Sequence, residues 1–192
     1  MSEPVDTAQR ILDVAQALVQ LRGFNAVSYT DISGPLGIRN ASVHYHFPLK
    51  TDLGISLVRR YRRHTEEQLE TILNATPSAR QRLNRYLEAY RTVIHPDGRI
   101  CLCTVLAGDA PTLPESMRRE VEEFFKLNQT WLTQVLEHGN ASGELQLRDT
   151  PELLAELLLA ALEGAMLLAR TSHAPGRFEA IGQRAIKAML TF

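Results

Sequence analysis

Apolar residues recur at intervals of three and four along most of this 192-residue chain, the spacing that places them on one face of an α-helix. A first helix is expected from Asp6, as its N-cap, to Arg22, with Gly23 as a stop signal. Longer helices are expected over about 49–74 and 78–94, between 112 and 139, from about 150 to 169, and after Pro175. No segment alternates convincingly with a period of two, so the pattern predicts an all-α fold.

Two shorter helices are expected between the first two long ones. Ser28 and Asp31 have the spacing of a capping box, which starts a helix that ends near the Gly-Pro-Leu-Gly run at 34–37. After a turn, a third helix of about eight residues begins near Arg39. Two short helices joined by a tight turn predict a helix-turn-helix, whose second helix lies in the major groove of DNA.

The start of this third helix carries the side chains expected to read DNA. Arg39 can pair bidentately with guanine, Asn40 with adenine, and Ser42 with a base or a phosphate. Ala41 is small enough for close approach.

The second half of the stretch has different roles. Val43 and Phe47 lie four residues apart and are expected to pack inward on the first helix, while His44 and Tyr45 project toward the groove wall. Lys50 stands at the start of the next helix, where an ammonium group and a helix N-terminus can hold a phosphate together.

The run from Ser28 to Leu53, SYTDISGPLGIRNASVHYHFPLKTDL, resembles the DNA-binding signature of the TetR family of bacterial transcriptional repressors. The matching positions are Ser28, Asp31, Ile32, Gly37, Ile38, His46, Phe47, Lys50 and Leu53. The sequence departs from the usual signature at four positions, Pro35, Arg39, Ala41 and His44. His44 replaces a tyrosine that contacts phosphate in the family, and Pro35 is unusual for the last turn of the second helix.

The resemblance implies a ligand-released repressor that acts as a homodimer on a palindromic operator. Residues 1–50 would form the helix-turn-helix DNA-binding domain, together with the start of the connecting helix to about 65, and residues 51–192 the helical ligand-binding and dimerisation domain. The expected DNA-binding residues are Ser28, Tyr29, Arg39, Asn40, Ser42, His44, Tyr45 and Lys50.

The segment from Leu153 to Ala169 is apolar nearly all round, so one side must face something other than its own core. Paired with the last helix, it would form a four-helix dimer interface as in the family. The expected interface residues are Leu157, Ala161, Gly164, Ala165, Phe178, Ile181 and Met189.

An inducer would bind inside the C-terminal bundle and would be apolar or aromatic rather than a sugar phosphate. The candidate lining residues are Tyr86, Tyr90, Cys101, Cys103, Phe124, Phe125 and Trp131. The aromatic members could equally be ordinary core residues. The two cysteines are either small core residues or electrophile sensors, because Arg99 and a nearby helix start could lower a thiol pKa.

Composition narrows the remaining function classes. The chain is 44% hydrophobic with a net charge of -1, so DNA would have to be held by a local basic patch. One basic run could contribute to such a patch or could be only a solvated helix face: Arg59, Arg60, Arg62 and Arg63. Motifs for catalysis are lacking, so neither an enzyme nor a cofactor is expected. His44 and His46 point about 200° apart on a helix and cannot share a metal ion.

The location of the chain follows from its termini and its most apolar segment. Glu156 and Glu163 interrupt that segment, which argues against a membrane span, and the N-terminus lacks a secretion signal. We therefore expect a cytoplasmic protein. The alternative to a DNA-binding regulator is a helical protein-interaction module.

Overall fold

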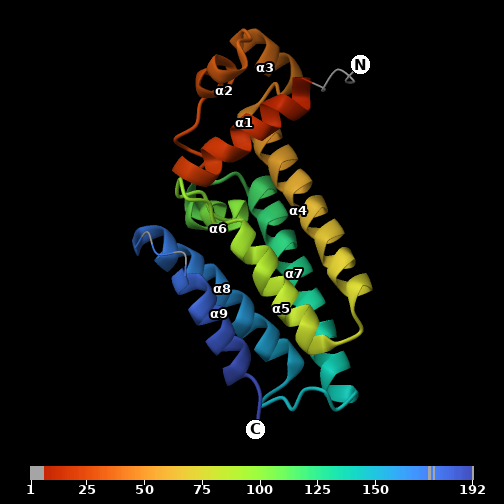
Figure 1. The fold of residues 1–192 in the computed structure, drawn as a ribbon. Coiled ribbons are helices and arrows are strands. Elements are labelled where there is room, and N and C mark those ends of the chain that lie inside the picture. The colour runs from red at the N-terminus through yellow and green to blue at the C-terminus, as the bar shows by residue number, and fades with distance from the viewer. Residues whose placement is uncertain (1–6, 173, 175, 192) are drawn as a thin grey trace, which may run out of the picture. The chain divides into compact units, whose positions relative to one another are not determined.

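The computed structural model describes residues 7–172, 174 and 176–191, and its regular elements within those ranges are helices (Figure 1). They are α1 (Thr7–Arg22), α2 (Tyr29–Leu36), α3 (Asn40–His46), α4 (Lys50–Ala75), α5 (Ala79–Thr92), α6 (Leu102–Gly108), the 3₁₀ turn η1 (Ala110–Thr112), α7 (Glu115–Ala141), α8 (Pro151–Ser172) and α9 (Gly176–Ala188). The predicted all-α fold is confirmed. The N-cap expected at Asp6 lies outside the described residues.

The described residues group into two compact units. The first, called here the head unit, contains residues 7–62 together with 102–122, and the second, the core unit, contains 63–101 and most of 123–191. The head unit therefore includes α6, η1 and the start of α7 as well as the helix-turn-helix. The head unit overlaps the predicted DNA-binding domain, 1–50 with the start of the connecting helix to about 65, and adds α6, which is distant in sequence yet has contacts with α1.

The head unit has its own apolar core. Ile11, Ala15 and Val19 lie on one face of α1 and are fully or almost fully buried. Gly54 in α4 has no room for a Cβ atom, because Met117 of α7 and the Phe24 ring occupy that space. The close approach of α4 and α7 at this point depends on the absence of a side chain at residue 54.

The core unit is built from the ends of α4 and α7 with α5, α8 and α9. Figure 1 shows α8 and α9 side by side, and α9 also contacts α5. Gly182 lets α9 approach closely, since a Cβ atom there would meet Leu87 of α5 and Leu162 of α8. Helix α5 begins at a cap in which the Glu144 carboxylate accepts hydrogen bonds from the main-chain N–H groups of Ala79 (2.7 Å) and Arg80 (3.1 Å).

Helix α7 ends at Ala141, close to the end expected at Gly139 and the residues that follow it. Gly139 itself lies within the helix and serves packing, because Leu145 and Ala79 occupy the space that a Cβ atom would need. The chain reverses at Gly143, whose φ of +73° lies in the left-handed region that glycine adopts without steric cost. Thr112, expected to cap α7, instead donates its hydroxyl to the carbonyl of Asp109 at 2.8 Å.

Candidate functional site

The helix-turn-helix is formed by α2 and α3, and local sequence determines its geometry. The Ser28 hydroxyl accepts from the Asp31 N–H, and the Ser28 N–H donates to the Asp31 carboxylate at 2.8 Å, which is the predicted capping box. Helix α2 includes Pro35, ends at Leu36 and is closed by Gly37, whose φ of +65° is left-handed. Pro35 therefore does not break the last turn of α2, which runs on to Leu36 before the turn into α3.

The inner face of α3 is fixed to the head unit as expected. Val43 is fully buried and Phe47 is 6% exposed. Tyr29 is also buried, and its hydroxyl donates to the Phe47 carbonyl at 2.6 Å. Tyr29 is among the expected DNA-binding residues; in the structure its phenol ties α2 to the end of α3, and a DNA contact of Tyr29 stays a prediction.

Asn40 opens α3, but its amide is occupied within the head unit. Its Oδ1 accepts a hydrogen bond from the Ser33 hydroxyl at 2.5 Å, and its Nδ2 donates to the Thr30 hydroxyl at 2.9 Å. Adenine recognition needs both the donor and the acceptor of an asparagine amide. The structure therefore gives Asn40 the role of a clamp between α2 and α3 in place of the expected base reader.

The outward face of α3 consists of side chains with few internal contacts. Arg39 is the N-cap residue and is exposed, with no side-chain hydrogen bond to the helix. Ser42 is half-buried, and Tyr45 is 82% exposed, the largest exposure of any large apolar residue that the structure describes. His44 is exposed with its ring edge-on to Tyr29 at 4.5 Å between centroids.

A groove of about 410 Å³ lies beside this face and is lined by Asn25, Ala26, Val27, Ser28, Tyr29, His44 and Lys50. The Lys50 ammonium group sits 4.7 Å from the centroid of the Phe24 ring and 3.5 Å from the Asn25 carbonyl. Partial burial lowers the pKa of Lys50, while the carboxylates of Asp109 and Asp31 act in the opposite direction. Lys50 is therefore held in the groove, where the first main-chain N–H groups of α2 also lack partners within their own helix.

A connection between η1 and the loop after α1 was not predicted. The Phe24 N–H donates to the Asp109 carboxylate at 2.7 Å, and the Asn25 amide donates to the Thr112 hydroxyl at 2.7 Å. Gly23 precedes this loop with a φ of +85°. We call this set of contacts the Asp109 latch; its residues are 85 and 87 positions apart, so no local sequence pattern could indicate it.

The arginine run in α4 is used for internal ion pairs. The Arg59 guanidinium lies 2.6 Å and the Arg62 guanidinium 3.4 Å from the Glu120 carboxylate. Arg60 lies 2.7 Å from the Asp13 carboxylate. These three arginines join α4 to α7 and α1. Arg59 and Arg63 are also exposed to solvent, as on the solvated helix face that the sequence allowed.

The core unit contains a buried cluster that includes several of the expected ligand residues. Tyr86 and Tyr90 both donate to the Oδ1 atom of Asn128, at 3.0 and 3.1 Å, and Tyr86 stacks on Trp131 at 5.3 Å between ring centroids. Burial raises the pKa of both tyrosines well above its usual value, and the nearby Glu163 carboxylate adds to the shift. Both phenols are therefore neutral hydrogen-bond donors at physiological pH.

Asn128 is the member of this cluster that sequence reasoning missed. It is fully buried, and its Nδ2 donates to the Phe124 carbonyl. The signal was present, because Asn128 falls four residues after Phe124 and three before Trp131, on the apolar stripe of α7. Phe124 is buried and Phe125 half-buried, while the indole N–H of Trp131 meets no acceptor in the described part of the chain.

Both cysteines are buried and neither forms a disulfide. Cys101 falls in the core unit and Cys103 in the head unit. The Arg99 guanidinium, expected to activate Cys101, is paired with the Asp97 carboxylate at 2.8 Å. Burial together with this pairing opposes thiolate formation and favours the interpretation of both cysteines as core residues.

The expected dimer residues divide into two groups. Ala165, Phe178 and Met189 are at most 1% exposed and pack within the core unit, which corrects their assignment to a contact surface. Leu157 is 58% exposed, and Ala161, Gly164 and Ile181 are half-buried. The exposed side of α8 carries further leucines, Leu153, Leu167 and Leu168, with exposed fractions of 55%, 46% and 43%. We call this set of leucines with Leu157 the α8 leucine stripe.

The described residues also bear on metal binding and membrane insertion. Among residues 7–172, 174 and 176–191, no three His, Cys, Asp or Glu side chains are grouped so that they could hold a metal ion. Within the same described ranges, no helix combines the length and the hydropathy that a bilayer crossing requires.

Comparison with known proteins gives a consistent result. Residues 79–185 match the family described as "Tetracyclin repressor-like, C-terminal domain". A TetR-family transcriptional regulator from Agrobacterium tumefaciens has a solved structure that is 37% identical, with a TM-score of 0.92 over 96% of this chain and 97% of that one. The transcriptional repressor NemR of Escherichia coli (strain K12) is 24% identical over 88% of this chain and 86% of its own length.

A third relative is the transcriptional regulator AcuR of Cereibacter sphaeroides, which is 26% identical over 80% of this chain and 72% of its own length. The family match covers more than half of the chain, and the solved structure extends it across the helix-turn-helix. The chain therefore belongs to the TetR family and is a transcriptional regulator rather than an enzyme.

Proposed function

We propose that the protein is a homodimeric repressor that binds a palindromic operator through α3 and leaves it when a small molecule occupies the core unit. The observation that carries this proposal is the exposed face of α3, where Arg39, His44 and Tyr45 stand outward from a helix whose inner face is fixed by Val43 and Phe47. Exposed hydrogen-bonding side chains on a rigid short helix are what major-groove reading requires.

Within this interface Arg39 is the base-reading residue. It is the first exposed side chain of the recognition helix, and its guanidinium has the fork that pairs with O6 and N7 of guanine. Tyr45 would contact the groove wall. The Asn40 clamp would set the position of α3 and so act on every base pair alike.

Phosphate binding would use the groove next to α3. Lys50 and His44 line it together with the start of α2, whose first-turn N–H groups attract an anion. The Ser28 hydroxyl and N–H are both used by Asp31, so Ser28 would contribute its position in the capping box rather than a bond to phosphate.

Dimer formation would bury the α8 leucine stripe against a second copy of this chain. Four leucines with exposed fractions of 43% to 58% on one helix form an apolar surface that a monomer would leave in water. Gly164 adds to this argument, because nothing lies within 4 Å of the place where its Cβ atom would be. A palindromic operator would require the two α3 helices of such a dimer to reach successive major grooves, about 34 Å apart.

The experiment that tests the proposal is selection of operator DNA from a random pool, followed by binding measurements for the parent, Arg39→Ala and a matched control. Arg10→Ala changes an exposed arginine of α1 in the same head unit and serves as that control. We expect a two-fold symmetric operator, and we expect Arg39→Ala to change the ranking of operator variants at a cost of about 1 to 3 kcal/mol at one base pair.

Two results would reject this function. Recovery of no enriched sequence would leave the protein-interaction module as the better description. An unchanged ranking of operator variants for Arg39→Ala, equal to that of Arg10→Ala, would show that α3 is not the reading helix.

A further inference from the structure

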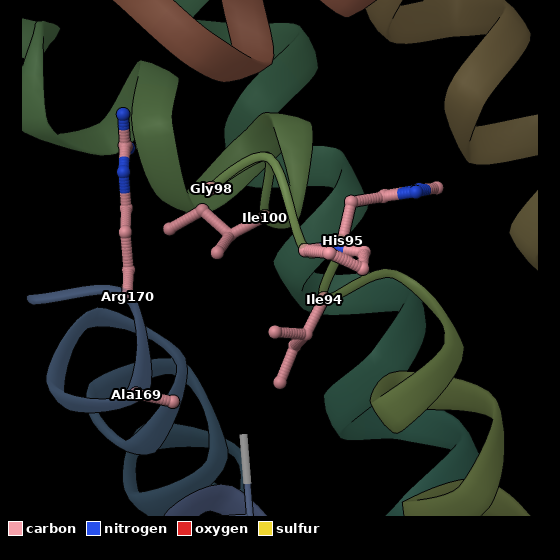
Figure 2. Close-up of a pocket in the computed structure, with 7 residues that line it drawn as sticks. Ile94, His95, Gly98, Ile100, Ala169 and Arg170 are labelled. Carbon is pink, nitrogen blue, oxygen red and sulfur yellow. The ribbon is translucent and has the colours of Figure 1, made fainter. Parts of the chain in front are cut away.

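The proposed function leaves open the roles of a cavity in the core unit and of the Asp109 latch in the head unit. The cavity has a volume of about 310 Å³, and Figure 2 shows Ile94 and Ala169 facing it, with Arg170 along one side. Arg170 already interacts within the protein, so its charge does not define a class of ligand for the cavity. The latch lies within one compact unit, and its contacts lead to the groove beside α3.

We propose that Asp109 and Thr112, which follow α6, are positioning residues for operator binding and act through Lys50. Neither is among the described residues that line the groove in which Lys50 lies. They act on the loop after α1, which contacts the Lys50 ammonium group. Their effect on the operator rests on the repressor function proposed above, whereas their effect on the position of Lys50 does not.

The loop after α1 supplies two contacts to the Lys50 ammonium group. The centroid of the Phe24 ring lies 4.7 Å from it, and the Asn25 carbonyl accepts a hydrogen bond from it at 3.5 Å. The Phe24 ring occupies space beside α4 that Gly54, about one helical turn after Lys50, leaves free. An ammonium group has three N–H donors, so those that do not face Asn25 remain available to a phosphate.

The latch fixes this loop at the two residues that hold Lys50. The Phe24 N–H donates to the Asp109 carboxylate at 2.7 Å, and the Asn25 side-chain amide donates to the Thr112 hydroxyl at 2.7 Å. Phe24 and Asn25 therefore contact both the latch and the ammonium group. Hydrogen bonds weaken steeply as their angle departs from linearity, so a loop held by these two bonds keeps a narrow range of positions.

The main chain of Asp109 is itself anchored in the head unit. Its N–H donates to the Val105 and Leu106 carbonyls at 3.3 and 3.1 Å. Its carbonyl accepts from the N–H and the hydroxyl of Thr112, at 2.9 and 2.8 Å. Leu106 is 1% exposed, and its helix, α6, contacts α1. The carboxylate that holds the loop therefore projects from a fixed turn.

Charge and position predict opposite effects of Asp109 on DNA binding. Burial lowers the pKa of Lys50, and the Asp109 carboxylate is the larger of the two charges that oppose this shift. A negative charge near a phosphate-binding ammonium group should weaken the operator complex, so removing it should strengthen binding. Loss of the latch should weaken binding, because a freed lysine side chain must be ordered again when DNA binds.

The test compares Asp109→Ala with Asp109→Asn, which both remove the charge, in affinity for the selected operator. Asparagine keeps an oxygen that accepts from the Phe24 N–H, whereas alanine does not. We expect Asp109→Ala to bind about 2-fold to 12-fold more weakly than Asp109→Asn for each half-site, the cost of ordering one long side chain. In a Lys50→Ala background the two variants should bind equally. Glu115→Ala removes an exposed carboxylate at the start of α7 in the same unit and, as the matched control, should not weaken binding.

A second pair of variants makes the test independent of Asp109. Thr112→Val removes the hydroxyl that accepts from Asn25, and Thr112→Ser keeps it. We expect Thr112→Val to bind the operator more weakly than Thr112→Ser, by a smaller factor than the Asp109 pair because Thr112 is exposed. This difference should also disappear in the Lys50→Ala background.

Nuclear magnetic resonance of the full chain without DNA reports the position of Lys50 directly. The chain has three lysines, Lys50, Lys126 and Lys187, so labelling at lysine Cε gives three signals, and Lys50→Arg identifies the first. The ring current of Phe24 should separate the Lys50 signal from the other two. We expect Asp109→Ala to remove this separation, Thr112→Val to reduce it, and Asp109→Asn to keep it.

Equal operator affinities of Asp109→Ala and Asp109→Asn would overturn the positioning role. A difference of the same size in the Lys50→Ala background would also overturn it, since the latch would then act on the head unit as a whole. An unchanged Lys50 signal in both Asp109→Ala and Thr112→Val would show that the latch does not hold the ammonium group. A parent protein that binds no operator would instead reject the proposed repressor function, while the resonance measurement would still decide whether the latch positions Lys50.

Discussion

Replacing Asn40 with alanine distinguishes a clamp from a base reader. The substitution removes hydrogen bonds to Ser33 and Thr30 at 2.5 and 2.9 Å. Each neutral hydrogen bond contributes about 0.5 to 1.5 kcal/mol net, and Asn40 and Thr30 are exposed, which favours the lower value. The Ser33 hydroxyl is buried but keeps the Thr30 carbonyl at 3.4 Å as a second acceptor.

Helix propensity offsets part of this loss. Two bonds at the lower value contribute about 1 kcal/mol together, and alanine is better than asparagine in a helix by up to about 0.7 kcal/mol, so the net destabilisation expected for Asn40→Ala is about 0.3 to 1 kcal/mol. A clamp mutant should weaken all operator sequences by a similar factor, because the position of α3 changes for every base pair. A base reader would instead lose about 1 to 3 kcal/mol at one position, which is about 5-fold to 150-fold.

The assay combines denaturant unfolding with binding to every single-base variant of the selected operator. Thr30→Val removes one partner of Asn40 without changing α3, and the double variant Thr30→Val, Asn40→Ala should be less destabilised than the sum of the two single variants. A changed ranking of operator variants with an unchanged free energy of unfolding would refute the clamp and restore Asn40 as a base reader.

Four other predictions follow from single contacts. Lys50→Ala should weaken all operators alike and lower the slope of log affinity against log salt by about one, measured by titration at several salt concentrations. Asp109→Ala should lower the free energy of unfolding by about 1 to 3 kcal/mol, because a partly buried main-chain N–H loses its acceptor. Leu157→Glu should give monomers in sedimentation and lose operator binding. The hydrogen bond from the Ser78 hydroxyl is the main reason why the pKa of Glu144 is lowered in the folded protein. The stability that the Glu144 carboxylate contributes is therefore present above its unfolded-state pKa and is lost as the pH falls through its lower folded-state pKa. Glu144→Gln should reduce this acid-dependent loss of stability, measured as the free energy of unfolding against pH.

Matched controls make these outcomes specific. Leu73→Glu changes a leucine of α4 that is 40% exposed and lies off the stripe, so it should leave the dimer intact. Asp109→Asn keeps an oxygen acceptor and should cost less than Asp109→Ala. The dimer surface on α8 would be contradicted by dimers in Leu157→Glu. The phosphate role of Lys50 would be contradicted by an unchanged salt slope in Lys50→Ala, and the Asp109 latch by the same free energy of unfolding for both Asp109 variants. The Glu144 assignment would be contradicted by identical pH profiles for parent and Glu144→Gln.

The helices of this fold were predictable because their signals are local. Apolar spacing of three and four identified the long helices, and the Ser28 and Asp31 pair is present as the expected capping box. Gly139 shows the limit of local reading, since its role depends on Leu145 and Ala79, which lie outside its own turn. A glycine required by packing and a glycine that ends a helix have the same sequence signal.

The side chains of the candidate sites were harder to assign, because residue type does not determine the partner. Asn40 is suited to adenine by chemistry, yet two hydroxyl groups from α2 occupy its amide. Phe178 and Met189 were assigned to a dimer surface by helical periodicity, yet both are buried within the core unit. Helix α9 is apolar enough for either environment, and only the packing of α5 and α8 determines which of its faces is covered.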